Sequence, residues 1–195
     1  DPGDEVIIPE PFYANYNGFA QASDVKVIPV TSNIKDNFAL PSIELFEKKI
    51  NNRTKAILIC NPCNPTGYVY SKEEIINIAN LAKKNDLFII VDEVYREFIY
   101  SDLKHFSILE DETFFDNAIL IDSTSKRYSL CGARIGFIVS KNSNFIETCM
   151  KFALARLSPP TVALIAANNA LKSDSEYIGN VIKEYSTRRK VLIGE

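Results

Sequence analysis

The chain has 195 residues, a formal net charge of −3, 46% hydrophobic residues and 24% charged residues. This is the composition of an ordinary globular protein, and the scattered charges give no basic patch for nucleic acid and no polybasic signal for a membrane. No apolar run approaches the length that spans a bilayer, and the four cysteines are too sparse for a disulfide scaffold. We therefore expect a cytoplasmic protein in a reducing environment.

Six short runs of apolar and β-branched residues predict strands, each bounded by turn residues. Several of these runs are apolar throughout, which is typical of parallel strands that are buried on both faces of a sheet. The predicted strands cover residues 5–9, 25–30, 56–60, 87–91, 118–121 and 134–139.

Helical patterns lie between and after the strands. Residues 71–85 are the clearest case, because Ser71 and Glu74 form a capping box and apolar residues follow at helical spacing. Strands alternating with helices predict an α/β domain with a mainly parallel, doubly wound sheet, in which ligands bind beyond the carboxyl ends of the strands. The other predicted helices cover residues 42–50, 145–156, 161–172 and 176–192.

Both ends of the sequence resemble cuts through a longer protein. Asp1, Pro2 and Gly3 lead directly into the first predicted strand, without an initiator Met or a preceding helix. At the other end, the charged helical pattern of residues 175–195 stops abruptly. We therefore expect the chain to be a fragment.

Residues that could carry chemistry follow directly after the predicted strands. N-P-C-N-P-T-G stands at residues 61–67, D-E-V-Y at 92–95, S-T-S-K at 123–126 and G-A-R-I-G at 132–136, and P-E-P-F-Y follows the first strand at residues 9–13. Together these segments resemble the fold-type I, class I/II aminotransferases that depend on pyridoxal 5′-phosphate (PLP), aspartate aminotransferase among them. The resemblance covers about residues 1–139, and the first four motifs occur in the family's order and at close to its spacing.

The resemblance also implies a fold and a domain organisation. Residues 1–174 would form most of a three-layer PLP-binding large domain, with one antiparallel strand in the sheet and helices on both faces. Residues 175–195 would begin the helix that leads to a smaller C-terminal domain. An N-terminal segment that binds phosphate, the small domain with its arginine for the substrate carboxylate, and the partner subunit of a homodimer would lie outside this chain. We expect the fragment alone to bind PLP weakly and to have little activity.

Three of the motifs imply roles around the cofactor ring. Lys126 matches the lysine that holds PLP as a Schiff base, and its amine, once released, is the natural base for a proton at the substrate Cα. Asp92 matches the carboxylate that keeps the ring nitrogen protonated. Asn64 and Tyr95 match the residues that hydrogen-bond the phenolic oxygen, although Tyr95 could also be a core residue.

The phosphate and the ring face would be bound by four further residues. Ser123, Ser125 and Arg134 match the phosphate-binding positions, and an arginine offers a planar fork that suits phosphate oxygens. Tyr13 matches the aromatic residue that stacks on the pyridine ring, with an ordinary aromatic after a strand as the alternative. Tyr16 is a candidate for a supporting role behind it.

Two other signals are set aside. Cys60 and Cys63 form a C-x-x-C, but prolines place it in a loop and no second pair completes a zinc site. The single histidine, His105, is interpreted as a surface residue, and no metal site is expected.

Three functions remain open on these residues. The first is transfer of an amino group from an amino acid, with aspartate and aromatic amino acids as candidates, to a 2-oxo acid. The second is a PLP-dependent β-lyase or cyclising synthase, which would share all the cofactor contacts. The third is a non-catalytic PLP-binding module of a transcriptional regulator.

Overall fold

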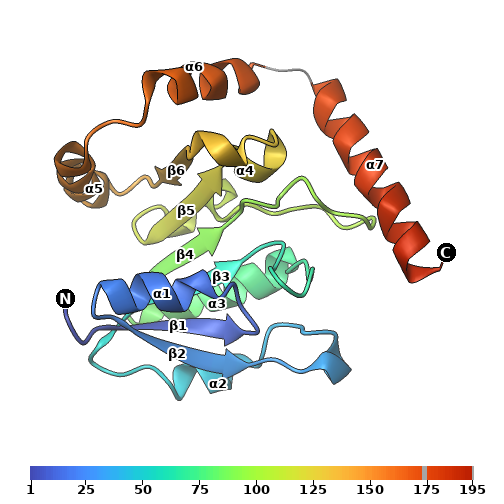
Figure 1. The fold of residues 1–195 in the computed structure, drawn as a ribbon. Helices are drawn as coiled ribbons and strands as arrows, with labels where there is room; N and C mark the ends of the chain where they lie inside the picture. The colour runs from blue at the N-terminus through green and yellow to red at the C-terminus, as the bar shows by residue number, and fades with distance from the viewer. Residues whose placement is uncertain (173–174, 195) are drawn as a thin grey trace.

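The computed structural model describes residues 1–172 and 175–194. Its centre is a six-stranded sheet in the order β2-β1-β3-β4-β5-β6 (Figure 1). The first five strands are parallel, and β6 is antiparallel to β5. The mainly parallel sheet with one antiparallel strand is therefore confirmed. The strands are β1 (Glu5–Glu10), β2 (Lys26–Thr31), β3 (Thr54–Cys60), β4 (Phe88–Asp92), β5 (Ala118–Ser123) and β6 (Gly136–Val139).

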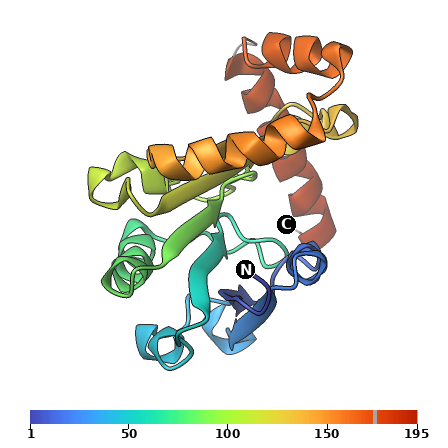
Figure 2. The ribbon, with the colours of Figure 1, turned by 90° about the vertical axis from the view of Figure 1, so that its left-hand side faces the viewer.

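Helices cover both faces of the sheet, with α1 (Asn15–Ala22) and α3 (Lys72–Lys84) on opposite sides (Figure 2). The other helices are α2 (Ile43–Glu47), α4 (Thr124–Arg127), α5 (Ser143–Arg156), α6 (Thr161–Ala170) and α7 (Ser175–Ile193). Short 3₁₀ turns cover Ile34–Asp36, Ile108–Glu110, Glu112–Phe114 and Cys131–Ala133.

The main core lies between the sheet and α3. Ile75, Ile78 and Ala82 share one face of the helix and are fully buried against the strands. The predicted capping box starts this helix: the Glu74 amide donates to Ser71 Oγ (3.2 Å), and the Ser71 amide donates to Glu74 Oε2 (2.7 Å). Complete burial of one such isoleucine contributes about 1.5–3 kcal/mol. The core therefore fixes the sheet on which the site is built.

Each predicted strand is present, and its ends lie within two residues of the prediction. The largest differences concern short or weakly marked elements. Helix α1 was missed, because it has no buried residue and no side-chain cap at Ala14, and it contains Gly18. The last strand starts at Gly136, not at Arg134, because Arg134 adopts a left-handed conformation with φ of 57°.

The C-terminal helices have few buried side chains. In the described residues of α5 and α6, Ala167 alone is buried. Large apolar side chains on these helices are exposed, and Phe152 is the extreme on α5 with 73% of its surface accessible. In the described part of the chain, no helix is both long and apolar enough to cross a membrane. The predicted domain boundary lies at residue 174, outside the described residues, and stays a prediction.

Candidate active site

The carboxyl ends of β3, β4 and β5 meet at one edge of the sheet, because the three strands are parallel neighbours. A cavity of about 250 Å³ lies there. The structure brings all eight predicted site residues to its wall: Tyr13, Asn64, Asp92, Tyr95, Ser123, Ser125, Lys126 and Arg134. We call this cavity the strand-end pocket.

Asp92 ends β4 and is held by two donors. The Tyr16 hydroxyl donates to Asp92 Oδ2 (2.7 Å), and the Val94 amide donates to Oδ1 (3.1 Å). Burial raises the pKa of Asp92, and the nearby carboxylates of Asp122 and Glu93 add to the rise, although the two hydrogen bonds oppose it. In the described residues no Lys or Arg forms an ion pair with Asp92. The pocket therefore has a carboxylate that a cationic group of a ligand would complement.

Tyr16 supports this carboxylate from behind. Burial raises the pKa of the Tyr16 hydroxyl far above its ordinary value, and the charges of Cys60 and Asp92 act in the same direction. The hydroxyl therefore stays protonated and remains a donor to Asp92. This supporting position agrees with the sequence-based expectation for Tyr16.

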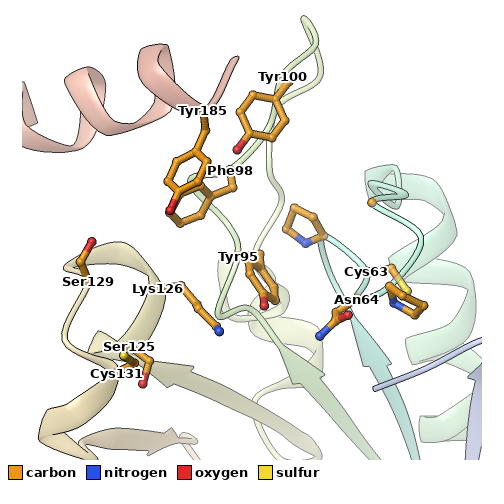
Figure 3. A pocket seen from close by; sticks show the side chains of 13 residues that line it. Cys63, Asn64, Tyr95, Phe98, Tyr100, Ser125, Lys126, Ser129, Cys131 and Tyr185 are labelled. Atoms are coloured by element: carbon orange, nitrogen blue, oxygen red, sulfur yellow. The ribbon is translucent and has the colours of Figure 1, made fainter. Parts of the chain in front are cut away.

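Lys126 lies across the pocket, in the short helix α4. Its Nζ is 5.6 Å from the centre of the Tyr95 ring. In Figure 3 the Lys126 amine and the Asn64 amide point into the space on either side of Tyr95. Lys126 is exposed, so its amine is open to a ligand.

The other wall of the pocket provides hydroxyl groups and a guanidinium. Ser123 Oγ accepts from the Ser125 amide (3.1 Å) and lies 2.8 Å from Ser125 Oγ. Arg134 Nη1 donates to the Cys131 carbonyl (2.8 Å). This bond uses one of the five N–H donors of the guanidinium. Donors and a positive charge on this wall suit the oxygens of an anionic group.

The whole of the chain, residues 1–195, matches the model of the family "Aminotransferase class I and II". The chain belongs to this aminotransferase family. It is 35% identical over 193 residues to an aspartate aminotransferase of Pyrococcus abyssi, covering 97% of this chain and 49% of that protein. The chain thus spans about half the length of the curated relatives that it matches.

Solved aminotransferase structures show the same fold. The structure of an aromatic aminotransferase from Pyrococcus horikoshii OT3 gives a TM-score of 0.90 at 34% identity, over 98% of this chain and 52% of the other. An aspartate aminotransferase from Thermotoga maritima gives 0.90 at 33% identity, over 100% and 50%. The predicted family and the fold of its large domain are confirmed.

Asp122 also lines the pocket and belongs to a cluster of charged residues that the sequence did not reveal. Asp122 Oδ2 accepts from Arg96 Nη2 (2.8 Å) and from Arg127 Nη2 (2.9 Å). Arg127 Nε also lies 2.7 Å from Glu97 Oε1. Burial opposes the charge of Arg127, but Asp122 and Glu97 outweigh it and raise its pKa. These ion pairs tie the loop after β4 to the end of β5.

A second buried network corrects the interpretation of His105 as a surface residue. The fully buried Glu93 accepts from the Ser107 hydroxyl (2.9 Å) and the Ile108 amide (3.1 Å). His105 Nε2 lies 2.9 Å from the other Glu93 oxygen, and its Nδ1 lies 3.4 Å from Asn61 Nδ2. The His105 side chain is only 14% exposed. The His105 ring lies mostly inside because a buried carboxylate needs donors, and the only sequence signal was Glu93 directly after a buried strand.

The C-x-x-C cysteines are not joined by a disulfide. Cys60 is buried beside the strand-end pocket, and burial together with the Asp92 charge raises the pKa of its thiol to about 12. A thiol this weakly acidic stays protonated and unreactive at neutral pH. In the described residues no group of three or more His, Cys, Asp or Glu side chains could hold a metal ion.

Proposed function

We propose that the protein is a PLP-dependent aminotransferase that transfers an amino group between an amino acid and a 2-oxo acid, with Lys126 as the covalent anchor of the cofactor. One observation carries this proposal. An amine, a carboxylate and a hydroxyl–guanidinium wall surround the same cavity, on loops that are far apart in the sequence. Membership of the aminotransferase family supports it.

The side chains fit the parts of PLP one by one. When bound, PLP supplies an electron sink for the Cα–H bond of an amino acid. Asp92 would hold a proton at the ring nitrogen, since its buried carboxylate has no cationic partner in the described residues. Asn64 and Tyr95 would donate to the phenolic oxygen, and Tyr13 would stack on the ring.

The remaining residues would bind the phosphate of PLP and transfer a proton. Ser123, Ser125 and Arg134 would donate to the phosphate oxygens, and the Lys126 amine would carry a proton to and from the substrate Cα. We also propose a homodimer, because α5 and α6 expose several large apolar side chains that a second copy would bury. The four free thiols agree with a cytoplasmic, reducing location.

Loading the full-length protein with PLP tests the anchor. We expect a visible absorbance band and a borohydride-reducible linkage, which peptide mapping should locate at Lys126. Lys126→Ala should abolish the reducible linkage. Lys141→Ala is the matched control, because Lys141 lies over Phe115 (5.5 Å) and does not line the pocket, so it should leave the linkage unchanged. A reducible adduct on another lysine in Lys126→Ala would refute the assignment.

The reaction class is tested by adding amino acids to the loaded protein. An aminotransferase should convert the cofactor to pyridoxamine phosphate and release a 2-oxo acid. Release of pyruvate and ammonia with recovery of the original absorbance band would instead indicate a β-lyase. Binding of PLP without either reaction would indicate the non-catalytic module.

A further inference from the structure

The helix that carries Lys126 is too short to hold its own position. Helix α4 has four residues, and a single turn has almost no stability by itself, so contacts with the rest of the chain must place it. Its first residue, Thr124, is fully buried, and the Thr124 hydroxyl donates to the Ile135 carbonyl (3.3 Å). Its last residue, Arg127, is also buried and directly follows Lys126. The contacts of Arg127 therefore fix the end of the helix at which Lys126 lies.

Arg127 belongs to a closed ring of ion pairs with Asp122, Glu97 and Arg96, which we call the ion-pair ring. Arg127 Nη2 donates to Asp122 Oδ2 (2.9 Å), and Arg127 Nε lies 2.7 Å from Glu97 Oε1. Arg96 contacts the same two oxygens: its Nη2 donates to Asp122 Oδ2 (2.8 Å), and its Nε donates to Glu97 Oε1 (3.3 Å). Each arginine thus bridges both carboxylates. Loss of either arginine would leave two mostly buried carboxylates with a single cation between them, which is unfavourable.

Three residues of the ion-pair ring are direct sequence neighbours of residues that line the strand-end pocket. The pairs are Tyr95 with Arg96, Asp122 with Ser123, and Lys126 with Arg127. Consecutive Cα atoms are held about 3.8 Å apart, so a displacement of the ring is passed on to these neighbours. The ring therefore ties the loop that carries Tyr95 to the helix that carries Lys126, whose Nζ lies 5.6 Å from the centre of the Tyr95 ring.

We infer that Arg127 is a positioning residue for Lys126: through Asp122 and Glu97 it holds the Lys126 amine in place for its bond with PLP. The inference rests on the proposed function, which assigns Lys126 to the cofactor. In that step the amine nitrogen bonds the aldehyde carbon of PLP, and the two amine protons leave with the aldehyde oxygen as water. Arg127 is not among the described residues that line the strand-end pocket, so it acts through the lysine.

The rate at which the linkage forms tests the inference in the cofactor-free, full-length protein, because this rate depends on the amine and on no later step. At saturating PLP the visible band should appear about 10- to 100-fold more slowly in Arg127→Met than in the parent, since misplacing a reacting group by about 1 Å can slow a reaction about 100-fold. Arg127→Lys should give a rate between the two, because one ammonium group cannot bridge two carboxylates as a guanidinium does.

Arg53→Met is the matched control. Arg53 also pairs with a buried carboxylate, that of Glu5 (3.0 Å), but this pair lies at the amino end of β1, at the opposite edge of the sheet from the pocket. The variant should therefore leave the rate of linkage formation unchanged. An equal slowing in Arg53→Met and Arg127→Met would overturn the inference, because it would show a general effect of lost stability.

Glu97→Gln tests whether Arg127 acts through the ion-pair ring. It should slow the linkage by about two- to tenfold, and the double variant with Arg127→Met should be no slower than Arg127→Met alone, because both changes break the same contact. Additive slowing in the double variant would overturn the inference, as would an Arg127→Met rate within about twofold of the parent. If Arg127→Met does not fold, parent rates in both Arg127→Lys and Glu97→Gln would overturn it. If the parent forms no reducible linkage at Lys126, the proposed function itself fails.

Discussion

The sheet region and the C-terminal helices of this chain are built differently. In the sheet region, apolar side chains are packed between β3, β4 and α3, and even the buried charges Glu93 and Asp122 have partners. The helices α5 and α6 have almost no buried side chains of their own. The first region therefore contains its own stabilising contacts, whereas the second leaves most of its apolar side chains exposed.

The largest expected difference is in the response to core truncation. Ile78 of α3 is fully buried, and Ile78→Ala should lower the free energy of unfolding by about 2–5 kcal/mol through lost apolar contact and a residual cavity. Leu154→Ala on α5 is the matched change, and because Leu154 is exposed it should stay within about 0.5 kcal/mol. Urea unfolding of both variants measures the difference. Equal losses would show that α5 is as tightly packed as α3.

Removing the charge of Glu93 compares a buried charged residue with one at the surface. Glu93→Gln keeps the shape but turns an N–H group toward the His105 ring and removes charge-assisted hydrogen bonds. We expect a loss of about 1–3 kcal/mol in the free energy of unfolding. Glu47→Gln is the control: Glu47 pairs with Lys84 (2.9 Å) at the surface and should contribute about 0–1 kcal/mol. An unchanged free energy of unfolding in Glu93→Gln would mean that the hydrogen-bond network around Glu93 contributes little to stability.

A smaller effect is expected at the helix caps. Ser71→Ala removes the side-chain acceptor at the start of α3 and should cost about 1 kcal/mol. Ser42 precedes α2 in the same position but makes no side-chain cap bond, so Ser42→Ala should cost much less. Thermal unfolding of the two variants gives the comparison directly. A similar fall of the unfolding temperature in both variants would mean that the capping hydrogen bonds of Ser71 do not stabilise the protein.

The positions of the strand-end residues could be predicted from the sequence, because they follow from the geometry of a parallel sheet. Parallel strands have their carboxyl ends at one edge of the sheet, so polar residues that follow β3, β4 and β5 must lie together. The roles of Lys126 and Asp92 toward the cofactor stay predictions, although both line one pocket.

The sequence pattern could not predict contacts between side chains that are far apart in the chain. His105 reaches Glu93 and Asn61 across 12 and 44 residues, and no local periodicity records such contacts. The same holds for Arg96 and Asp122, which are 26 residues apart, because each looks like an ordinary surface charge until the loop after β4 is placed. Tyr185 lies beside Phe98, with ring centres 6.0 Å apart, and this contact follows from the path of α7 and not from any motif.

Asp92 is an exception among the buried groups of the sheet region, because burial makes its charged form unfavourable. Its pKa is raised in the folded protein, so its own contribution to folding stability is highest below the ordinary pKa of an aspartate and falls as pH rises through the raised value. Asp92→Asn should remove this loss, so the cofactor-free variant should be slightly more stable than the parent at pH 7 and equally stable in acid. The same variant should bind PLP more weakly, because it lacks the charge that would hold a proton on the ring nitrogen. Thermal unfolding between pH 4 and 8 checks the first part and PLP titration the second. A cofactor-free Asp92→Asn that is less stable at pH 7 would mean that the hydrogen bonds from Tyr16 and Val94 outweigh the unfavourable burial of the carboxylate.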